Sequence, residues 1–291
     1  EAHILNALSL AFVDGQSLRT YRHAPNTGSR KSWAAGDATA RGVQLAFMAL
    51  KGEMGYPSAL TAPKWGFYDV LFGGESFKVS RPYGSYVMEN ILFKIAFPAE
   101  FHSQTAIECA FKLHNLVADN LTQIEKIVLT TQEPAIRIIS KTGPLYNPAD
   151  RDHCLQYLVA IGLLFGRLTA DDFEDERAAD PRIDAIRSLM VVEEDPQFTL
   201  DYYDENKRAI SNAIQVYFKD GTHTDKVVVE YPLGHRRRRM EGIPLLLEKF
   251  KANLLTAFPV LRAEEIYQLC LDKKGIETMP VHYFMELLIA G

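Results

Sequence analysis

The stretch AISNAIQVYFKDGTHTDKVVVEYP, from Ala209 to Pro232, carries the clearest local signal in the chain. Two runs in which apolar and polar residues alternate flank the pair Asp220 and Gly221. An Asp-Gly pair between alternating runs is typical of a β-hairpin, because both residue types tolerate the left-handed backbone of a tight turn. The sequence therefore predicts a β-hairpin over this stretch.

The region before the hairpin mixes strand and helix patterns. IEKIVLTT, residues 124–131, alternates and is rich in β-branched side chains, which predicts a strand. HSQTAIECAFKLHNLV (102–117) has the helical period, and PADRDHCLQYLVAIGLLFG (148–166) is apolar enough for a buried helix. MENILFKIAF (88–97) fits either a strand or a linker. An α+β region is therefore expected in the middle of the chain.

Helical patterns occupy both ends. Residues 2–13 indicate an apolar helix, and Asp37 is placed to cap a second helix that ends at Gly52. After the hairpin, helical patterns return over the ranges 243–258, 262–272 and 281–291. This order predicts a mainly α fold with an inserted α+β lid, divided into a helical domain (1–92), the lid (93–232) and C-terminal helices that return to the helical domain (233–291).

The first residues raise a further expectation. ILNALSLAFV, residues 4–13, reads as the middle of a packed element, and the chain begins with Glu1 rather than Met. We therefore expect the polypeptide to start further upstream, and the N-terminal half of the helical domain to be absent from this sequence.

Composition excludes several classes of protein. The chain has 291 residues and a net charge of -5, which argues against a general nucleic-acid binder. No apolar run approaches the roughly 20 residues that span a bilayer, so no membrane partner is expected. Cys109, Cys154 and Cys270 lie far apart, which excludes a zinc ribbon or a conventional iron–sulfur cluster and suggests a reducing compartment.

The stretch RHAPNTGSRKSWAAGDATARG, residues 22–42, is unusually cationic and rich in small residues. Lysine and arginine among glycines suit an anionic ligand such as a carboxylate or phosphate. The phosphate-loop pattern GxxxxGK[ST] is absent. The stretch is therefore either a solvated loop or an anion site, whose fixed cations are Arg22, Arg30, Lys31 and Arg41.

Three further segments contain candidate catalytic or binding residues. FKIAFPAEFHSQTA (93–106) places Lys94, Glu100 and His102 within nine residues, and these are usual proton-transfer side chains. A strand-edge lysine followed by the polar start of a helix is the simpler alternative. GPLYNPADRDHCLQY (143–157) holds Tyr146 and His153 beside acidic residues that are also ordinary helix caps. The four arginines of GHRRRRMEG (234–242) could form a solvated run or a nuclear-localisation-like patch, or neutralise a polyanion at the domain junction. Of the possible roles, we expect dimer packing or the rim of the site.

Six segments of the sequence together resemble the MmgE/PrpD family, and the resemblance extends over essentially the whole chain. The segments are RHAPNTGSRKSWAAGDA, GEMGYPSALTAPKWGFYDV, RPYGSYVMEN, FPAEFHSQTA, NPADRDHC and EYPLGHRRRR. The resemblance implies a helical domain completed by the C-terminal helices, an inserted α+β lid, a homodimer, and no metal or other cofactor. It also implies a cytoplasmic location for bacterial members and a mitochondrial one for fungal members.

The resemblance implies chemistry on a tricarboxylate. The nearest branch of the family eliminates water from 2-methylcitrate, and another branch decarboxylates cis-aconitate. A module that only binds ligand or dimerises is the non-enzymatic alternative. Lys31 and Lys94 match lysines of the family site, Tyr146 lies near a lid tyrosine of the decarboxylase branch, and Glu100 stands where that branch has a histidine.

These matches complete the predicted site. The expected catalytic residues are Lys94, His102, Glu100 and Tyr146. The expected substrate-binding residues are Lys31, Arg30, His23, Arg22 and His153.

Overall fold

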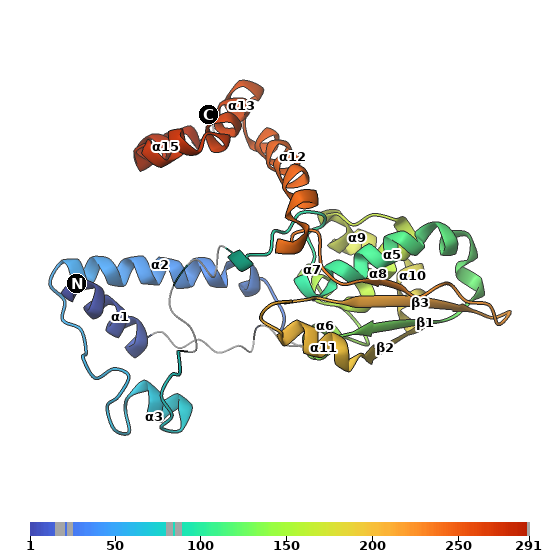
Figure 1. Cartoon of the computed structure of the whole chain (residues 1–291), viewed down its shortest axis with the longest axis horizontal. Coiled ribbons are helices and arrows are strands. Elements are labelled where there is room, and N and C mark those ends of the chain that lie inside the picture. The colour runs from blue at the N-terminus through green and yellow to red at the C-terminus, as the bar shows by residue number, and fades with distance from the viewer. Residues whose placement is uncertain (15–20, 22–25, 80–83, 85–88, 290–291) are drawn as a thin grey trace. The chain divides into compact units, whose positions relative to one another are not determined.

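A computed structural model describes residues 1–14, 21, 26–79, 84 and 89–289. The chain forms two compact units (Figure 1). The first unit comprises residues Glu1–Gly84 and Pro144–Arg151, and the second comprises Ser85–Gly143 and Asp152–Gly291. Helices and a small mixed sheet make up the described structure, so the predicted combination of α and β elements is confirmed.

The first unit is built on a helix pair. Helix α1 (Ala2–Asp14) packs against the longer α2 (Arg30–Leu50), and a ring nitrogen of His3 lies 2.8 Å from the carbonyl oxygen of Ala49. The short α3 (Phe67–Phe72) adds to an aromatic cluster in which the rings of Phe12 and Phe67 are 5.1 Å apart. Apolar packing of side chains therefore holds this unit together.

The predicted start of the second helix is wrong. Asp37 does not cap it, because α2 already begins at Arg30 and Asp37 lies inside it. The Asp37 carboxylate instead accepts from Arg30 at 3.0 Å and from Arg41 at 3.4 Å. This sequence is rich in alanine, and its charges are spaced so that they pair along one face of a helix, which favours helix. Residues 30–42 of the stretch 22–42 are therefore helical.

The second unit contains a four-stranded mixed sheet in the order β2-β1-β3-β4. Strand β1 (Ile124–Thr131) runs parallel to β2 (Met190–Glu194) and antiparallel to β3 (Asn212–Phe218), which pairs in turn with β4 (Val227–Val229). The strand predicted over 124–131 is confirmed. The predicted hairpin is also confirmed, with Gly221 in the left-handed region at φ 86°. Strand β2 was not predicted.

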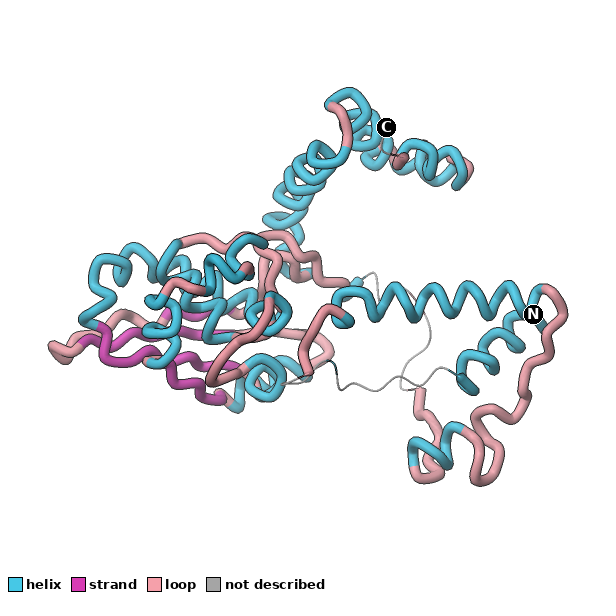
Figure 2. Tube along the Cα trace, turned by 180° about the vertical axis from the view of Figure 1, so that it is seen from behind, coloured by secondary structure: helices cyan, strands magenta, loops and turns pink. Residues whose placement is uncertain are grey.

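Two buried helices pack beside this sheet. Helix α5 (Gln104–Val117) contacts β3 and β4, and α8 (Leu155–Phe165) packs on α5 (Figures 1 and 2). A Cβ atom on Gly162 would lie 2.8 Å from the Cβ of Ala110, so glycine permits this close approach. The predicted buried helix over 148–166 is divided, because a shorter helix, α7 (Pro148–Asp152), precedes α8.

The remaining elements are short helices and the C-terminal series. Residues 91–97 form neither helix nor strand, so that stretch is a linker. Helices α12 and α13 share a small core around Leu254, Ala263 and Ile266. The bounds of these elements are η2 (Phe101–Ser103), η3 (Ala118–Gln123), α6 (Glu133–Ile139), η4 (Ala170–Phe173), α9 (Asp175–Ala178), α10 (Pro181–Ser188), α11 (Pro196–Tyr203), η5 (Arg236–Arg238), α12 (Arg239–Ala257), α13 (Val260–Leu271), α14 (Lys273–Thr278) and α15 (Val281–Leu287).

Gly234 supplies a direct test of this packing. The Phe93 backbone N–H donates to the Gly234 carbonyl at 3.1 Å, and a Cβ on Gly234 would lie 1.7 Å from the Phe93 carbonyl oxygen. Because two backbones would have to separate, we expect Gly234→Ala to lower the free energy of unfolding by roughly 2–4 kcal/mol in urea denaturation. The control is Gly42→Ala, which has open space around its Cβ within α2. It should raise stability by about 0.5–1 kcal/mol, and equal effects of the two changes would contradict the packing described.

Candidate active site

The turn that precedes α5 is held by its own side chains. Glu100 caps the short helix η2 by accepting the His102 backbone N–H at 2.8 Å. The buried Gln104 amide donates to the carbonyls of Phe97, at 3.1 Å, and Ala99, at 2.7 Å. These bonds satisfy backbone groups before the helix begins, so Glu100 and His102 are carried on a fixed turn.

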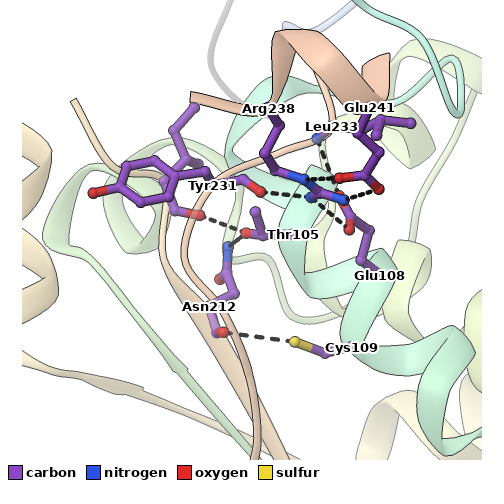
Figure 3. Close-up of polar contacts among 9 residues, drawn as sticks. Thr105, Glu108, Cys109, Asn212, Tyr231, Leu233, Arg238 and Glu241 are labelled. Atoms are coloured by element: carbon purple, nitrogen blue, oxygen red, sulfur yellow. Dashed lines mark hydrogen bonds and ion pairs between the residues drawn. The ribbon is translucent and has the colours of Figure 1, made fainter. Parts of the chain in front are cut away.

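Strand β3 fixes the same turn from the other side. The Asn212 side-chain amide donates to the His102 carbonyl at 2.8 Å and to the Thr105 hydroxyl at 2.7 Å. The Thr105 hydroxyl donates in turn to the Ile210 carbonyl. Figure 3 shows how Thr105, Cys109 and Asn212 join α5 to the start of β3. A residue 110 positions further along the chain therefore helps to determine where His102 lies.

Glu100, His102 and Tyr202 form one polar cluster. The Nδ1 atom of His102 lies 2.8 and 3.0 Å from the two carboxylate oxygens of Glu100, and its Nε2 lies 3.2 Å from the Tyr202 hydroxyl oxygen. A carboxylate at Nδ1 favours a proton on that nitrogen and leaves Nε2 as the acceptor. Burial, followed by the neighbouring Tyr203 and Glu100, raises the pKa of Tyr202, so its hydroxyl keeps its proton and can donate to Nε2.

This cluster borders a cavity of about 440 Å³ within the second unit. The volume suits a small organic molecule. Its walls combine aromatic and aliphatic surface with cationic and neutral polar groups. The described lining residues are Asn90, Leu92, Phe101, His102, Tyr202, Tyr203, Arg208, Ile210, His235 and Arg236.

The other predicted catalytic residues lie outside this lining. The Lys94 ammonium stands over the Phe101 ring, 5.1 Å from its centre, and the Lys94 carbonyl accepts from the Lys249 ammonium at 2.6 Å. Burial and then the charge of Lys94 lower the pKa of Lys249. Tyr146 is 72% exposed, and its backbone N–H donates to Asp150 at 3.3 Å. The structure thus brings Glu100 and His102 together. Lys94 contacts Phe101, which lines the cavity, but does not line the cavity itself.

The predicted substrate-binding residues have the following surroundings. Arg30 pairs with Asp37 and stacks on Trp33, with 4.4 Å between the guanidinium carbon and the ring centre. Lys31 is half-buried in the first turn of α2. His153 is buried in the second unit, with Nδ1 2.9 Å from the Asp152 carboxylate. The candidates Arg22 and His23 lie outside the described residues.

Each of the four arginines in the run 236–239 hydrogen-bonds to its own set of partners within the same chain. Arg236 donates to Asn90 and to two backbone carbonyls, and Arg237 donates to the Tyr231 hydroxyl at 2.7 Å. Arg239 donates to the Ile91 carbonyl at 3.1 Å. Arg238 donates to Glu108, Glu241 and the Tyr231 carbonyl, as Figure 3 shows. The interpretation that these arginines only face solvent is therefore wrong.

Sequence reasoning missed Tyr202, Tyr203, Arg208 and His235. The only available signal was local: a tyrosine pair among charged residues in DYYDENKR, just before the predicted hairpin, and a histidine directly before the arginines. Nothing in that local pattern indicates His102 as a neighbour, because the contact is made through tertiary packing.

The described residues offer neither a metal site nor a membrane-spanning helix. Within those ranges, no three His, Cys, Asp or Glu side chains are grouped so that they could hold a metal ion. In the same ranges, no helix combines the length and apolar character needed to cross a membrane.

Comparison with known proteins identifies the class. The MmgE/PrpD C-terminal domain model matches residues 97–273, and the MmgE/PrpD N-terminal domain model matches residues 1–80. The chain belongs to the MmgE/PrpD family, as its motifs predicted. The expectation that the N-terminal half of the helical domain is absent is not borne out, because the N-terminal domain model matches residues 1–80.

Individual relatives share one name. The chain is 63% identical over 289 residues to 2-methylcitrate dehydratase of Escherichia coli K12, covering 98% of this chain and 60% of the relative. It is 61% identical to the Cupriavidus necator enzyme of the same name (98% and 59%) and 58% identical to the mitochondrial one of Yarrowia lipolytica (98% and 55%). The chain therefore spans 55–60% of the length of these relatives.

His235 gives the site a predicted acid sensitivity. It is 1% exposed, and burial, followed by the charges of Arg236 and Arg237, lowers its pKa to about 4. The unfolded chain, with a histidine pKa of about 6.5, binds more protons between these values, so stability is complete above about pH 6.5 and falls as the pH drops towards 4. The expected loss is about 3 kcal/mol, measured by urea denaturation at several pH values.

Two variants separate this effect from general acid denaturation. His235→Gln should remove most of the change in stability between pH 6.5 and 4. His282→Gln, at an exposed position of α15, should leave the change as it is. If the free energy of unfolding of the His235 variant depends on pH as that of the parent does, another group is responsible for the loss of stability in acid.

Proposed function

We propose that this protein is a 2-methylcitrate dehydratase, which eliminates water from 2-methylcitrate to give 2-methyl-cis-aconitate. The observation that carries the proposal is 63% identity, over nearly the whole chain, to proteins of that name in bacteria, with 58% to a fungal one. The carboxylate–histidine pair of Glu100 and His102 beside a cavity supports it chemically.

The reaction sets three demands on the protein. A base must take a carbon-bound proton, an acid must protonate the departing hydroxyl group, and cations must balance the substrate carboxylates. His102 is suited to proton transfer because Glu100 orients its ring at Nδ1 and leaves Nε2 towards Tyr202 and the cavity. Histidine is the side chain that most often carries proton transfer in enzymes.

Further residues of the proposal come from the family resemblance. Lys94 and Tyr146 act with Glu100 and His102 in catalysis. The carboxylates of the substrate are bound by Lys31, Arg30, His23, Arg22 and His153. Glu100, at a position where the decarboxylase branch has a histidine, favours dehydration over decarboxylation of cis-aconitate.

The proposed architecture follows the same resemblance. Residues 1–92 and 233–291 form a helical domain, and residues 93–232 form the α+β lid inserted into it. The enzyme acts as a homodimer, cytoplasmic in a bacterium and mitochondrial in a fungus. Side chains carry the whole reaction, without a metal or an organic cofactor.

The proton-transfer assignment is tested with Lys94→Met and His102→Gln. Loss of one general acid or base should lower turnover of 2-methylcitrate by roughly 100- to 10,000-fold. Turnover is followed by the ultraviolet absorbance of the unsaturated product, and folding by thermal melting. Lys126→Met in β1 and His223→Gln near the hairpin turn are matched controls that should keep parental rates.

The outcomes of that experiment decide between the candidate functions. Turnover within a few fold of the parent in both site variants would contradict the assignment of Lys94 and His102. Release of carbon dioxide from cis-aconitate, without dehydration of 2-methylcitrate, would indicate a decarboxylase. Ligand binding without either reaction would indicate a binding module.

A separate prediction concerns affinity. Lys31→Ala should raise the KM for 2-methylcitrate roughly tenfold or more, because a charge-assisted bond to a carboxylate is lost. Lys51→Ala, at the exposed C-terminal end of the same helix, should leave KM unchanged. A parental KM in a folded Lys31 variant would remove Lys31 from the substrate site.

A further inference from the structure

Arg208 is held in an unusual backbone conformation beside the cavity. It lies between α11 and β3 with φ 50°, in the left-handed region that residues other than glycine and asparagine rarely adopt. Its backbone N–H donates to the Asp204 carbonyl at 2.8 Å, and the next residue, Ala209, donates to the Asp201 carbonyl at 3.1 Å. The turn is therefore fixed by hydrogen bonds, and it presents an arginine where a smaller residue would fit the backbone better.

The guanidinium of Arg208 has no hydrogen-bond acceptor in the described part of the chain. Its Nε atom is buried and unbonded, and the side chain makes no ion pair with a described residue. Its neighbour Arg236, by contrast, donates to Asn90 and to the carbonyls of Glu205 and Asn206. Buried donors are nearly always satisfied, so the buried, unbonded Nε of Arg208 in a cavity wall points to an acceptor supplied by a ligand.

The other walls define the chemistry of that ligand. None of the described lining residues is acidic, and two are arginines. His235 adds no charge near neutral pH because its pKa is lowered to about 4. The Tyr202 hydroxyl and His102 lie along the same cavity, and Leu92, Phe101 and Ile210 supply apolar surface. A small anion with a hydrocarbon frame matches this combination of fixed cation, neutral donors and apolar wall.

We infer that Arg208 binds a carboxylate group of a small organic polycarboxylate in this cavity, next to His102. The planar guanidinium suits a carboxylate, to which it can donate two parallel N–H bonds. Arg208 is then a binding residue that sets specificity, and His102 remains the proton-transfer group. The assignment of the ligand as the substrate rests on the proposed function, whereas carboxylate binding in the cavity does not.

The test is citrate binding by isothermal titration calorimetry with the purified protein. Arg208→Asn removes the cation but tolerates the left-handed backbone, so it should fold with a melting temperature close to that of the parent. It should bind citrate at least tenfold more weakly, and Arg208→Lys should fall between the two. Arg182→Gln, an exposed arginine paired with Asp180 in α10, is the control and should bind as the parent does.

Kinetics separate this inference from the proposed function. Arg208→Asn should raise the KM for 2-methylcitrate at least tenfold while kcat stays within a few fold of the parent. Parental citrate affinity and KM in the Arg208→Asn and Arg208→Lys variants, with dehydration intact, would overturn the inference and leave the function standing. Failure of the parent to bind citrate would also overturn it. Weaker citrate binding in an Arg208 variant of a protein that never dehydrates 2-methylcitrate would support the inference and refute the function.

Discussion

The contacts of Arg238 hold together the segments on which the second unit depends. Its guanidinium donates to both Glu108 oxygens at 3.0 and 2.8 Å, to the Tyr231 carbonyl at 2.7 Å and to Glu241. These partners belong to α5, to the segment after β4 and to the first turn of α12 (Figure 3). Both side chains of the Arg238–Glu108 pair are largely shielded from water, so loss of Arg238 would leave the Glu108 carboxylate without this compensating charge.

The candidate site depends on this junction. The same face of α5 that carries Glu108 also carries Thr105, whose hydroxyl links Asn212 and Ile210 at the start of β3. The turn before α5 holds His102, and the segment after β4 holds His235 and Arg236 in the cavity wall. Three parts of the chain that are distant in sequence are thereby fixed around one cavity, which is the preorganisation that proton transfer requires.

The sequence predicted those elements whose conformation depends on interactions between neighbouring residues. The hairpin over 209–232 and the strand over 124–131 were predicted correctly, because alternation and turn chemistry are properties of neighbouring residues. The start of α2 was predicted incorrectly. The glycines and cations in 22–42 suggest a loop, whereas Arg30, Asp37 and Arg41 pair along a helix. Strand β2 was missed because its partner in the sheet, β1, lies about 60 residues earlier in the chain.

The same distinction separates the predicted and unpredicted parts of the site. Glu100 and His102 were chosen together because they are two residues apart, and the structure joins them in one cluster. The sequence could not predict Tyr202 and Arg208 as site residues, since only tertiary packing brings them to His102. The arginine run forms one motif in the sequence, but Arg236 and Arg238 have separate partners because the residues of a 3₁₀ turn point in different directions.

The most direct test of the account is side-chain nitrogen NMR of the histidines during titration with 2-methylcitrate. If His102 is the proton-transfer group, its ring signals should shift on binding, and Nε2 should be the nitrogen whose environment changes, because Nδ1 stays bonded to Glu100. The signals of His114, whose ring is bonded to the Leu163 carbonyl at 2.8 Å, should stay in place. Saturation with 2-methylcitrate that leaves the His102 signals unmoved would contradict the account.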